Sequence, residues 1–103
     1  MYTDGMKRDE VIATLLNHRA ELQRRGVVHA ALFGSVARDE ARADSDIDIM
    51  IDIDPENQMG VFEFVGLQRY IGGFFDRPVD VVEQAGLKAL IRPSVLADAV
   101  YAF

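Results

Sequence analysis

Hydrophobic residues recur along the first quarter of the chain with the spacing of an amphipathic helix. From Lys7 to about Arg25, apolar side chains return every three to four positions, which predicts a helix with one apolar face. The apolar positions are Val11, Ile12, Leu15, Leu16 and Leu22. Gly26 is typical of a helix end, and residues 1–6 are expected to form a loose end. Residues 27–33 form a short apolar run that favours a buried strand.

A second pattern begins at residue 46, where the sequence DIDIMIDI alternates with a period of two. This period predicts a strand over residues 46–53 with two different faces. One face would carry Ile47, Ile49, Ile51 and Ile53, and the other Asp46, Asp48, Met50 and Asp52. A short helix over residues 35–40, with Ser35 as its N-cap, would precede this strand.

The remaining patterns predict a helix over 61 to about 70, a strand over 79–82 and a short helix over 93 to about 100. Helices and strands therefore alternate along the chain. This order favours an α/β fold, with a small mixed β-sheet and helices packed mainly on one face.

Aromatic and histidine positions add expectations about the core and the surface. We expect four phenylalanines in the core: Phe62, Phe64, Phe74 and Phe75. Three further aromatic residues are candidates for an apolar patch that a partner would cover: Tyr70, Tyr101 and Phe103. His29 lies in an apolar strand and is expected in the core, whereas His18 is expected at the surface. Neither histidine is assigned a chemical role.

Composition narrows the class of protein. Half of the 103 residues are hydrophobic and 27% are charged, which is typical of a folded chain, and we expect one domain over residues 1–103. No apolar run is long enough to span a membrane. The sequence has no cysteine, which excludes disulfides, thiolate zinc sites and cysteine nucleophiles and fits a reducing, cytoplasmic location. With a net charge of −6, the chain is not expected to bind nucleic acid directly.

The strongest chemical signal is the pair Asp46 and Asp48. Residues two apart on a strand point the same way, with Cα atoms about 6.8 Å apart, so the two carboxylates would repel each other. A divalent cation would relieve this repulsion, and oxygen ligands favour magnesium or manganese over zinc. Two such cations can assist an in-line phosphoryl transfer. The structural alternative is an edge strand with a solvated acidic face.

Phosphate-binding features lie next to this pair in the sequence. Gly34-Ser35 stands at a predicted strand-to-helix turn, where glycine allows close backbone approach and the helix start offers N–H groups. Arg38, one turn further, could contact the same phosphates, and Arg42 is a second candidate for such a contact. Asp80, in a predicted neighbouring strand, would supply a third carboxylate, either as a general base or as a ligand of the second cation. Alternatively, Gly34-Ser35 is an ordinary turn and Asp80 pairs with an arginine such as Arg77.

These residues carry a family resemblance. Gly34-Ser35, ten residues, Asp46, one residue and Asp48 match the GSx10DxD pattern of the nucleotidyltransferase superfamily, whose fold is shared with DNA polymerase β. The wider stretch GSVARDEARADSDIDIMID resembles the minimal nucleotidyltransferases (MNT domains), which occur as antitoxins beside HEPN-domain toxins. Asp39 departs from the pattern, because the family usually has glycine there, and its charge could weaken nucleotide binding.

The resemblance implies a nucleotidyltransferase fold and a specific reaction. Asp46, Asp48 and Asp80 would form the catalytic, Mg²⁺-binding triad for two ions, with Mn²⁺ as a substitute. Gly34 and Ser35 would hold the nucleotide triphosphate, and Arg38, from its position one turn into the predicted helix, is the third candidate nucleotide-binding residue. The enzyme would transfer a nucleoside monophosphate, by expectation AMP from ATP, to a hydroxyl such as a tyrosine on a HEPN ribonuclease toxin. The alternatives are an antitoxin that acts by binding alone and a homodimeric enzyme that modifies a small molecule.

Overall fold

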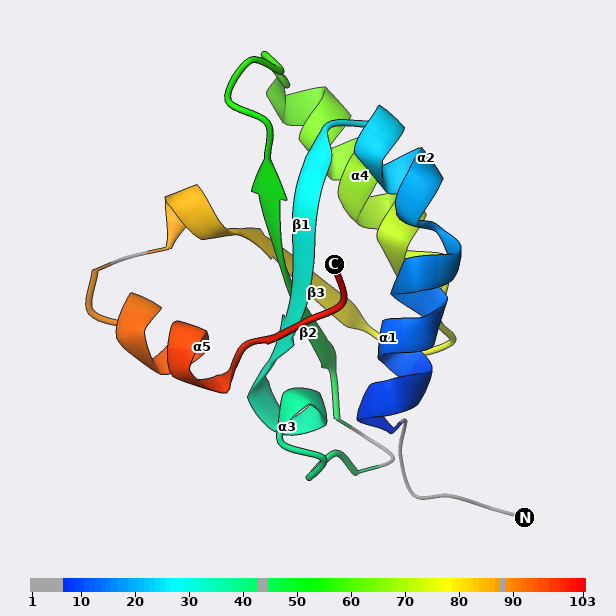
Figure 1. The fold of residues 1–103 in the computed structure, drawn as a ribbon, viewed down its shortest axis with the longest axis vertical. Coiled ribbons are helices and arrows are strands. Elements are labelled where there is room, and N and C mark those ends of the chain that lie inside the picture. The colour runs from blue at the N-terminus through cyan, green and yellow to red at the C-terminus, as the bar shows by residue number, and fades with distance from the viewer. Residues whose placement is uncertain (1–6, 43–44, 88) are drawn as a thin grey trace.

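The computed structural model describes residues 7–42, 45–87 and 89–103, so the predicted loose end at residues 1–6 lies outside the described residues (Figure 1). The elements in chain order are α1 (Arg8–Asn17), α2 (Arg19–Arg24), β1 (Val27–Phe33), α3 (Gly34–Ala37), β2 (Ile47–Ile53), α4 (Val61–Gly72), β3 (Val79–Glu83), the 3-10 turn η1 (Gln84–Gly86), α5 (Arg92–Asp98) and β4 (Val100–Tyr101). The predicted α/β class and mixed sheet are confirmed. No helix in these ranges is long and apolar enough to cross a membrane.

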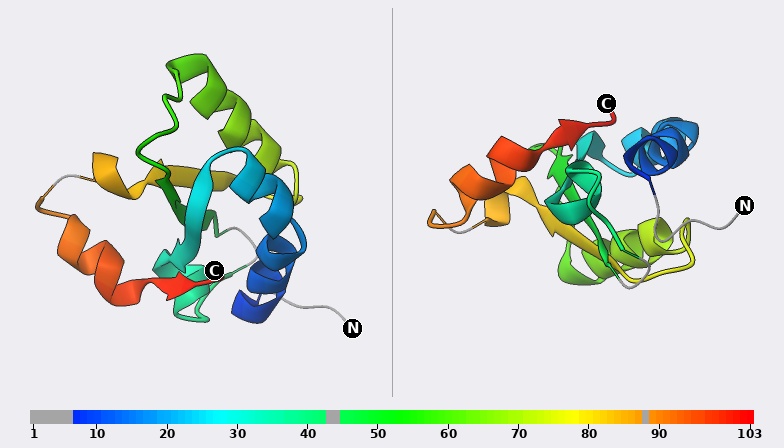
Figure 2. Two further views of the ribbon diagram at one scale, coloured as in Figure 1. Left: turned by 45° about the horizontal axis from the view of Figure 1, so that its top comes forward. Right: turned by 90° about the horizontal axis from the view of Figure 1, so that it is seen from below.

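The sheet has the strand order β3-β2-β1-β4. β1 pairs antiparallel with both β2 and β4, whereas β2 and β3 run parallel. α1, α2 and α4 lie on one side of the sheet and α5 lies on the other (Figures 1 and 2). The predicted packing of helices mainly on one face therefore holds for α1, α2 and α4, whereas α5 is the exception. Because α3 follows β1 directly, it lies at the end of the sheet where β2 begins.

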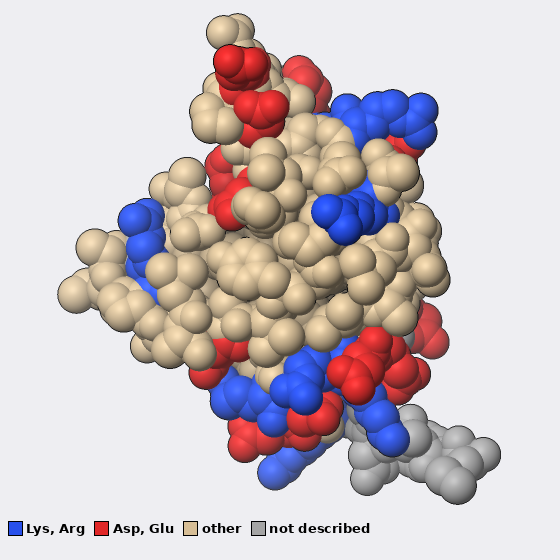
Figure 3. All heavy atoms as spheres, in the orientation of Figure 1, with Lys and Arg blue, Asp and Glu red and all other residues tan. Residues whose placement is uncertain are grey.

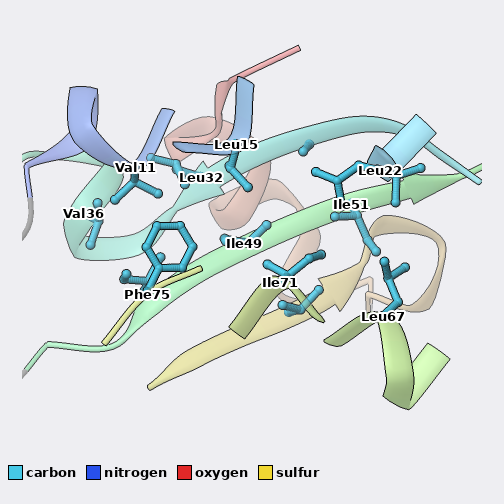
Figure 4. Close-up of a cluster of buried hydrophobic side chains, with 14 of the residues drawn as sticks. Val11, Leu15, Leu22, Leu32, Val36, Ile49, Ile51, Leu67, Ile71 and Phe75 are labelled. Atoms are coloured by element: carbon cyan, nitrogen blue, oxygen red, sulfur yellow. The ribbon is translucent and has the colours of Figure 1, made fainter. Parts of the chain in front are cut away.

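The core forms between the isoleucine face of β2 and the covering helices. Ile47, Ile49 and Ile51 are buried, as the period of two predicts. They pack with side chains from α1, α2 and α4, as Figure 4 shows for Leu15, Leu22, Leu67 and Ile71. Met50, on the opposite face of β2, is also buried, so that face is polar only where the aspartates stand.

The predicted first helix is interrupted at His18, which separates α1 from α2. Its Nδ1 lies 2.9 Å from the Thr14 carbonyl oxygen, and its ring stacks on Phe74 with centroids 3.7 Å apart. His18 is therefore half-buried, and the predicted surface position was wrong. Leu16, which the helical stripe placed on the apolar face, is instead 43% exposed. The break at His18 divides the one predicted helix into two, and a continuous periodicity cannot reveal it.

His29 is exposed, so the predicted core position was wrong. The pairing of β1 with β2 shifts register between Val27 and His29, and this irregularity alters which side chains face the core. Phe62 is also a correction, since it is 91% exposed near the start of α4.

The other core phenylalanines were predicted correctly, whereas the predicted apolar patch was not fully exposed. Phe75 is buried, while Phe64 and Phe74 are half-buried against the core, in line with their predicted positions. Tyr101 is exposed, but Tyr70 and Phe103 pack against the core. The predicted patch is therefore only partly open to solvent.

The C-terminal segment differs from the prediction of one helix over 93 to about 100. α5 ends at Asp98, and Val100 and Tyr101 add a fourth strand next to Leu32 and Ala31 of β1. A two-residue strand carries no periodic signal, so only the tertiary pairing defines it. The same pairing brings α5 close to α3.

Candidate active site

Asp48 and Asp80 lie directly opposite each other on the parallel strands β2 and β3. Neighbouring strands are about 4.8 Å apart and paired residues face the same side of a sheet, so the two carboxylates lie side by side. Asp46 comes immediately before β2, two residues from Asp48, and is exposed. The structure therefore brings two of the predicted carboxylates together and leaves the third adjacent in the chain.

Charge repulsion within this group is visible at Asp48. Burial, followed by the negative charges of Asp80 and then Asp46, raises the pKa of the Asp48 carboxyl above its ordinary value. The positive charge of Arg38 acts in the opposite direction and lowers this pKa. Asp48 thus feels all three charged groups that the sequence pattern assigned to one site.

Gly34 adjoins the Asp48 carboxylate. Phe33, the last residue of β1, is the register partner of Asp48, and Gly34 follows with a φ of +73°. A Cβ added to Gly34 would overlap the Asp48 carboxylate and would lie only 3.3 Å from its Cγ. Glycine therefore satisfies two requirements here, the left-handed backbone and the close approach of backbone to a carboxylate.

Ser35 lies in the first turn of α3 and is half-buried. The predicted N-cap role of Ser35 was wrong, because Phe33 occupies the N-cap position without a side-chain capping bond. α3 is also shorter than predicted and ends at Ala37. The chain leaves β1 and enters the helix without an intervening polar turn, and this places Ser35 one residue beyond the Gly34 bend.

Arg38 follows α3 and carries two ion pairs. Its Nε donates to Glu40 at 2.7 Å, and its Nη1 donates to Asp98 of α5 at 2.6 Å. These hydrogen bonds raise the pKa of the Arg38 guanidinium. The contact with Asp98 spans 60 positions of the chain, and sequence reasoning did not anticipate it.

The alternative pairing of Asp80 with Arg77 is not what the described residues show. Arg77 Nη1 donates instead to the carbonyl oxygen of Arg42 at 3.3 Å, and Asp80 is exposed. Arg77 thereby contacts the backbone four residues before Asp46. The side chain of Arg42 itself is exposed. Asp80 stays available beside Asp48.

Asp39, where the family pattern usually has glycine, has a φ of +60°. This left-handed conformation explains a preference for glycine, and aspartate is among the few other residues that tolerate it. The Asp39 carboxylate accepts a hydrogen bond from the backbone N–H of Arg8 at 3.2 Å. Its charge is therefore engaged at the start of α1.

The carboxylates offer only oxygen ligands, which suits a hard divalent cation. Within residues 7–42, 45–87 and 89–103, no three acidic or histidine side chains converge as a complete metal site. Burial first, and then the negative charges of Asp80 and Asp46, raise the pKa of Asp48, and a cation beside these carboxylates would offset the repulsion. The oxygen-only donors are of the kind that magnesium prefers, and the carboxylates nearest to Asp48 in the sheet and in the chain are Asp80 and Asp46.

The repulsion gives a stability prediction for Asp48→Asn. Because the folded state raises the pKa of Asp48, this carboxylate contributes stability when protonated at low pH and loses it as pH rises through that pKa. At neutral pH the melting temperature of the variant should therefore be a few degrees higher than that of the wild type. This corresponds to a gain of roughly 1 kcal/mol or less in the free energy of unfolding. Thermal unfolding without metal measures the effect, and Asp52→Asn on the same strand is the control. A lower melting temperature for Asp48→Asn at neutral pH would contradict the prediction.

Comparison with known proteins identifies the family of this chain. Residues 15–102 match the nucleotidyltransferase domain family, so the chain belongs to that family and is a nucleotidyltransferase. It is 36% identical over 94 residues to the protein adenylyltransferase MntA of Thermococcus cleftensis. The aligned region covers 90% of this chain and 93% of MntA. The predicted membership of the nucleotidyltransferase family is confirmed.

Solved structures show the same fold. A structure that carries the name minimal nucleotidyltransferase superposes with a TM-score of 0.76 at 30% identity and covers 92% of this chain and 95% of that chain. A chain from the complex of tri-AMPylated Shewanella oneidensis HEPN toxin with MNT antitoxin has a TM-score of 0.66 at 15% identity. The superposition covers 93% of this chain and 71% of that chain. The predicted nucleotidyltransferase fold is therefore confirmed.

Proposed function

We propose that this chain is an Mg²⁺-dependent protein adenylyltransferase that acts as an antitoxin. It transfers AMP from ATP to a hydroxyl, by our proposal a tyrosine, of a HEPN ribonuclease toxin and releases pyrophosphate. The observation that carries the proposal is the placement of Asp48 beside Asp80, with Gly34 against the Asp48 carboxylate. The similarity to MntA supports adenylyl transfer to a protein, and the AMPylated HEPN complex supports the class of partner.

Three carboxylates take the metal-binding role in this proposal: Asp46, Asp48 and Asp80. Bound divalent cations would neutralise charge on the triphosphate and on the departing pyrophosphate. Asp80 is exposed at this edge of the sheet, so its carboxylate is accessible to an incoming acceptor. It would either accept the proton of the attacking hydroxyl or complete the second metal site.

The phosphate chain would lie along the start of α3. Gly34 has no side chain to obstruct it, and the first N–H groups of a helix have no intrahelical acceptor, so they are available to phosphate oxygens. The Ser35 hydroxyl would donate one further hydrogen bond. Arg38 would add a guanidinium contact, because its positive charge already reaches the carboxylate site.

The direct test is intact-mass spectrometry of a purified HEPN toxin after incubation with this chain, ATP and Mg²⁺. We expect a mass increase by one or more AMP groups that requires both the metal and the nucleotide, and peptide mapping should place it on tyrosine. Parallel reactions with the other nucleoside triphosphates define the donor. Absence of an adduct with every nucleotide, from a toxin that forms a stable complex with this chain, would refute the enzymatic proposal.

A second candidate function is neutralisation of the toxin by binding alone, which the negative charge of the chain would support. The net charge of −6 would suit a basic RNA-binding cleft on a ribonuclease. Growth rescue from the toxin separates the two functions. A catalytic antitoxin loses rescue on Asp48→Asn although toxin binding is retained, whereas a binding antitoxin keeps both.

A further inference from the structure

The ion pairs of Arg38 connect the candidate nucleotide site to α5. Charged side chains of both signs gather over the end of the molecule where α3 lies, while the middle of the same face, over β1 and β4, is uncharged (Figure 3). Within this charged end, Arg38 is held from two sides, by Glu40 two residues away and by Asp98 from a distant part of the chain.

The two carboxylates engage different edges of the guanidinium. Glu40 accepts from Nε at 2.7 Å and Asp98 accepts from Nη1 at 2.6 Å. None of the described residues accepts a hydrogen bond from Nη2. A planar guanidinium held at two of its nitrogens has a defined orientation, so the direction of the third is also defined.

Arg38 is also close to the catalytic carboxylates. It lies one turn beyond Gly34, whose backbone adjoins Asp48, and its backbone N–H donates to the Gly34 carbonyl oxygen at 3.2 Å. Because Glu40 and Asp98 engage Nε and Nη1, Nη2 is the nitrogen that remains to donate to a group bound near Gly34.

We infer that Asp98 is a positioning residue for the nucleotide, which acts by orienting Arg38 toward the triphosphate. The inference rests on the proposed function, because it assigns Arg38 to the phosphates. Glu40 supports the same orientation, but its side chain is 63% exposed and it lies on the same short segment as Arg38. Asp98, at the end of α5, is 33% exposed and holds Arg38 from a separate element.

Positioning of Arg38 by Asp98 and competition of Asp98 with phosphate have opposite effects on nucleotide binding. Two carboxylates beside Arg38 offset its positive charge, so they could compete with phosphate for its N–H groups. Positioning predicts that ATP binding weakens when Asp98 is neutralised, whereas competition predicts that it strengthens. An exposed ion pair is weak, so either effect is expected to be moderate.

The experiment is a double-mutant cycle on the binding of Mg²⁺-ATP by the intact chain, measured by calorimetry. We expect Asp98→Asn to weaken ATP binding by about two- to fivefold and Arg38→Gln by about tenfold or more. In the Arg38→Gln background, Asp98→Asn should have no further effect, because Asp98 acts through Arg38. Asp98→Glu, which keeps the charge, should restore part of the affinity.

Glu21→Gln is the matched control. The Glu21 side chain is 34% exposed and accepts hydrogen bonds from Arg24 and Arg25, but it lies outside the site. This variant should leave ATP binding unchanged. Tighter binding by Asp98→Asn, or equal weakening with and without Arg38, would overturn the inference, the second outcome indicating only that Asp98 docks α5. Failure of the wild-type chain to bind Mg²⁺-ATP at all would instead refute the proposed function.

Discussion

Replacing Asp48 with asparagine should reduce AMP transfer by about a thousandfold or more. Asp48 lies at the centre of the carboxylate group, opposite Asp80 and two residues from Asp46. Asparagine has nearly the same shape but carries no negative charge, so the proposed site loses its best-placed anionic ligand. Metal-assisted charge stabilisation contributes several kcal/mol to such reactions, and each 1.36 kcal/mol corresponds to about a factor of ten in rate. Single-turnover transfer to the HEPN toxin measures the loss.

Asp52→Asn is the matched control for this change. Asp52 lies on the same strand and the same predicted face, but four residues further along, where it pairs with His29 of β1. We expect its transfer rate to stay within a few-fold of the wild type. The stability measurement strengthens the interpretation, since Asp48→Asn should be inactive although it is at least as stable as the wild type. Comparable rates for the wild type and Asp48→Asn would remove Asp48 from the mechanism.

Replacing Gly34 with alanine should impair both stability and transfer. The φ of +73° disfavours any residue with a Cβ, at a cost of about 1–2 kcal/mol. The new methyl group would also displace the Asp48 carboxylate, which adjoins Gly34. A displacement of about 1 Å in a catalytic group can reduce the rate about a hundredfold. We therefore expect a melting temperature several degrees lower, together with a transfer rate reduced by about two orders of magnitude.

Gly66→Ala separates the local effect from the general effect of replacing glycine. Gly66 lies inside α4, and a Cβ there would meet no atom within 4 Å. Alanine is favoured over glycine inside a helix by about 0.5–1 kcal/mol, so this variant should be slightly more stable and fully active. If Gly34→Ala were as active as Gly66→Ala, the close approach of Gly34 to Asp48 would have no catalytic importance.

Local pattern was sufficient for most of the elements of this fold. The alternation in β2 correctly predicted which face is buried, because a strand places successive side chains on opposite sides whatever its neighbours. The strand β1 was recognised instead from its run of apolar and β-favouring residues. The errors fall where an element is short or irregular. They include the break at His18, the exposure of His29 and the strand β4, each of which depends on packing or pairing between distant segments.

The amino-acid sequence by itself determined which residues are candidates for the site, because Gly34-Ser35, Asp46 and Asp48 occur at a spacing that predicts a metal and a phosphate. Only the tertiary structure decided that Asp80 is the register partner of Asp48, that Gly34 adjoins this carboxylate and that Asp98 reaches Arg38. The physical reason is that strand register and helix docking depend on how the whole core packs. No local spacing records the distance between residues that are far apart in the chain.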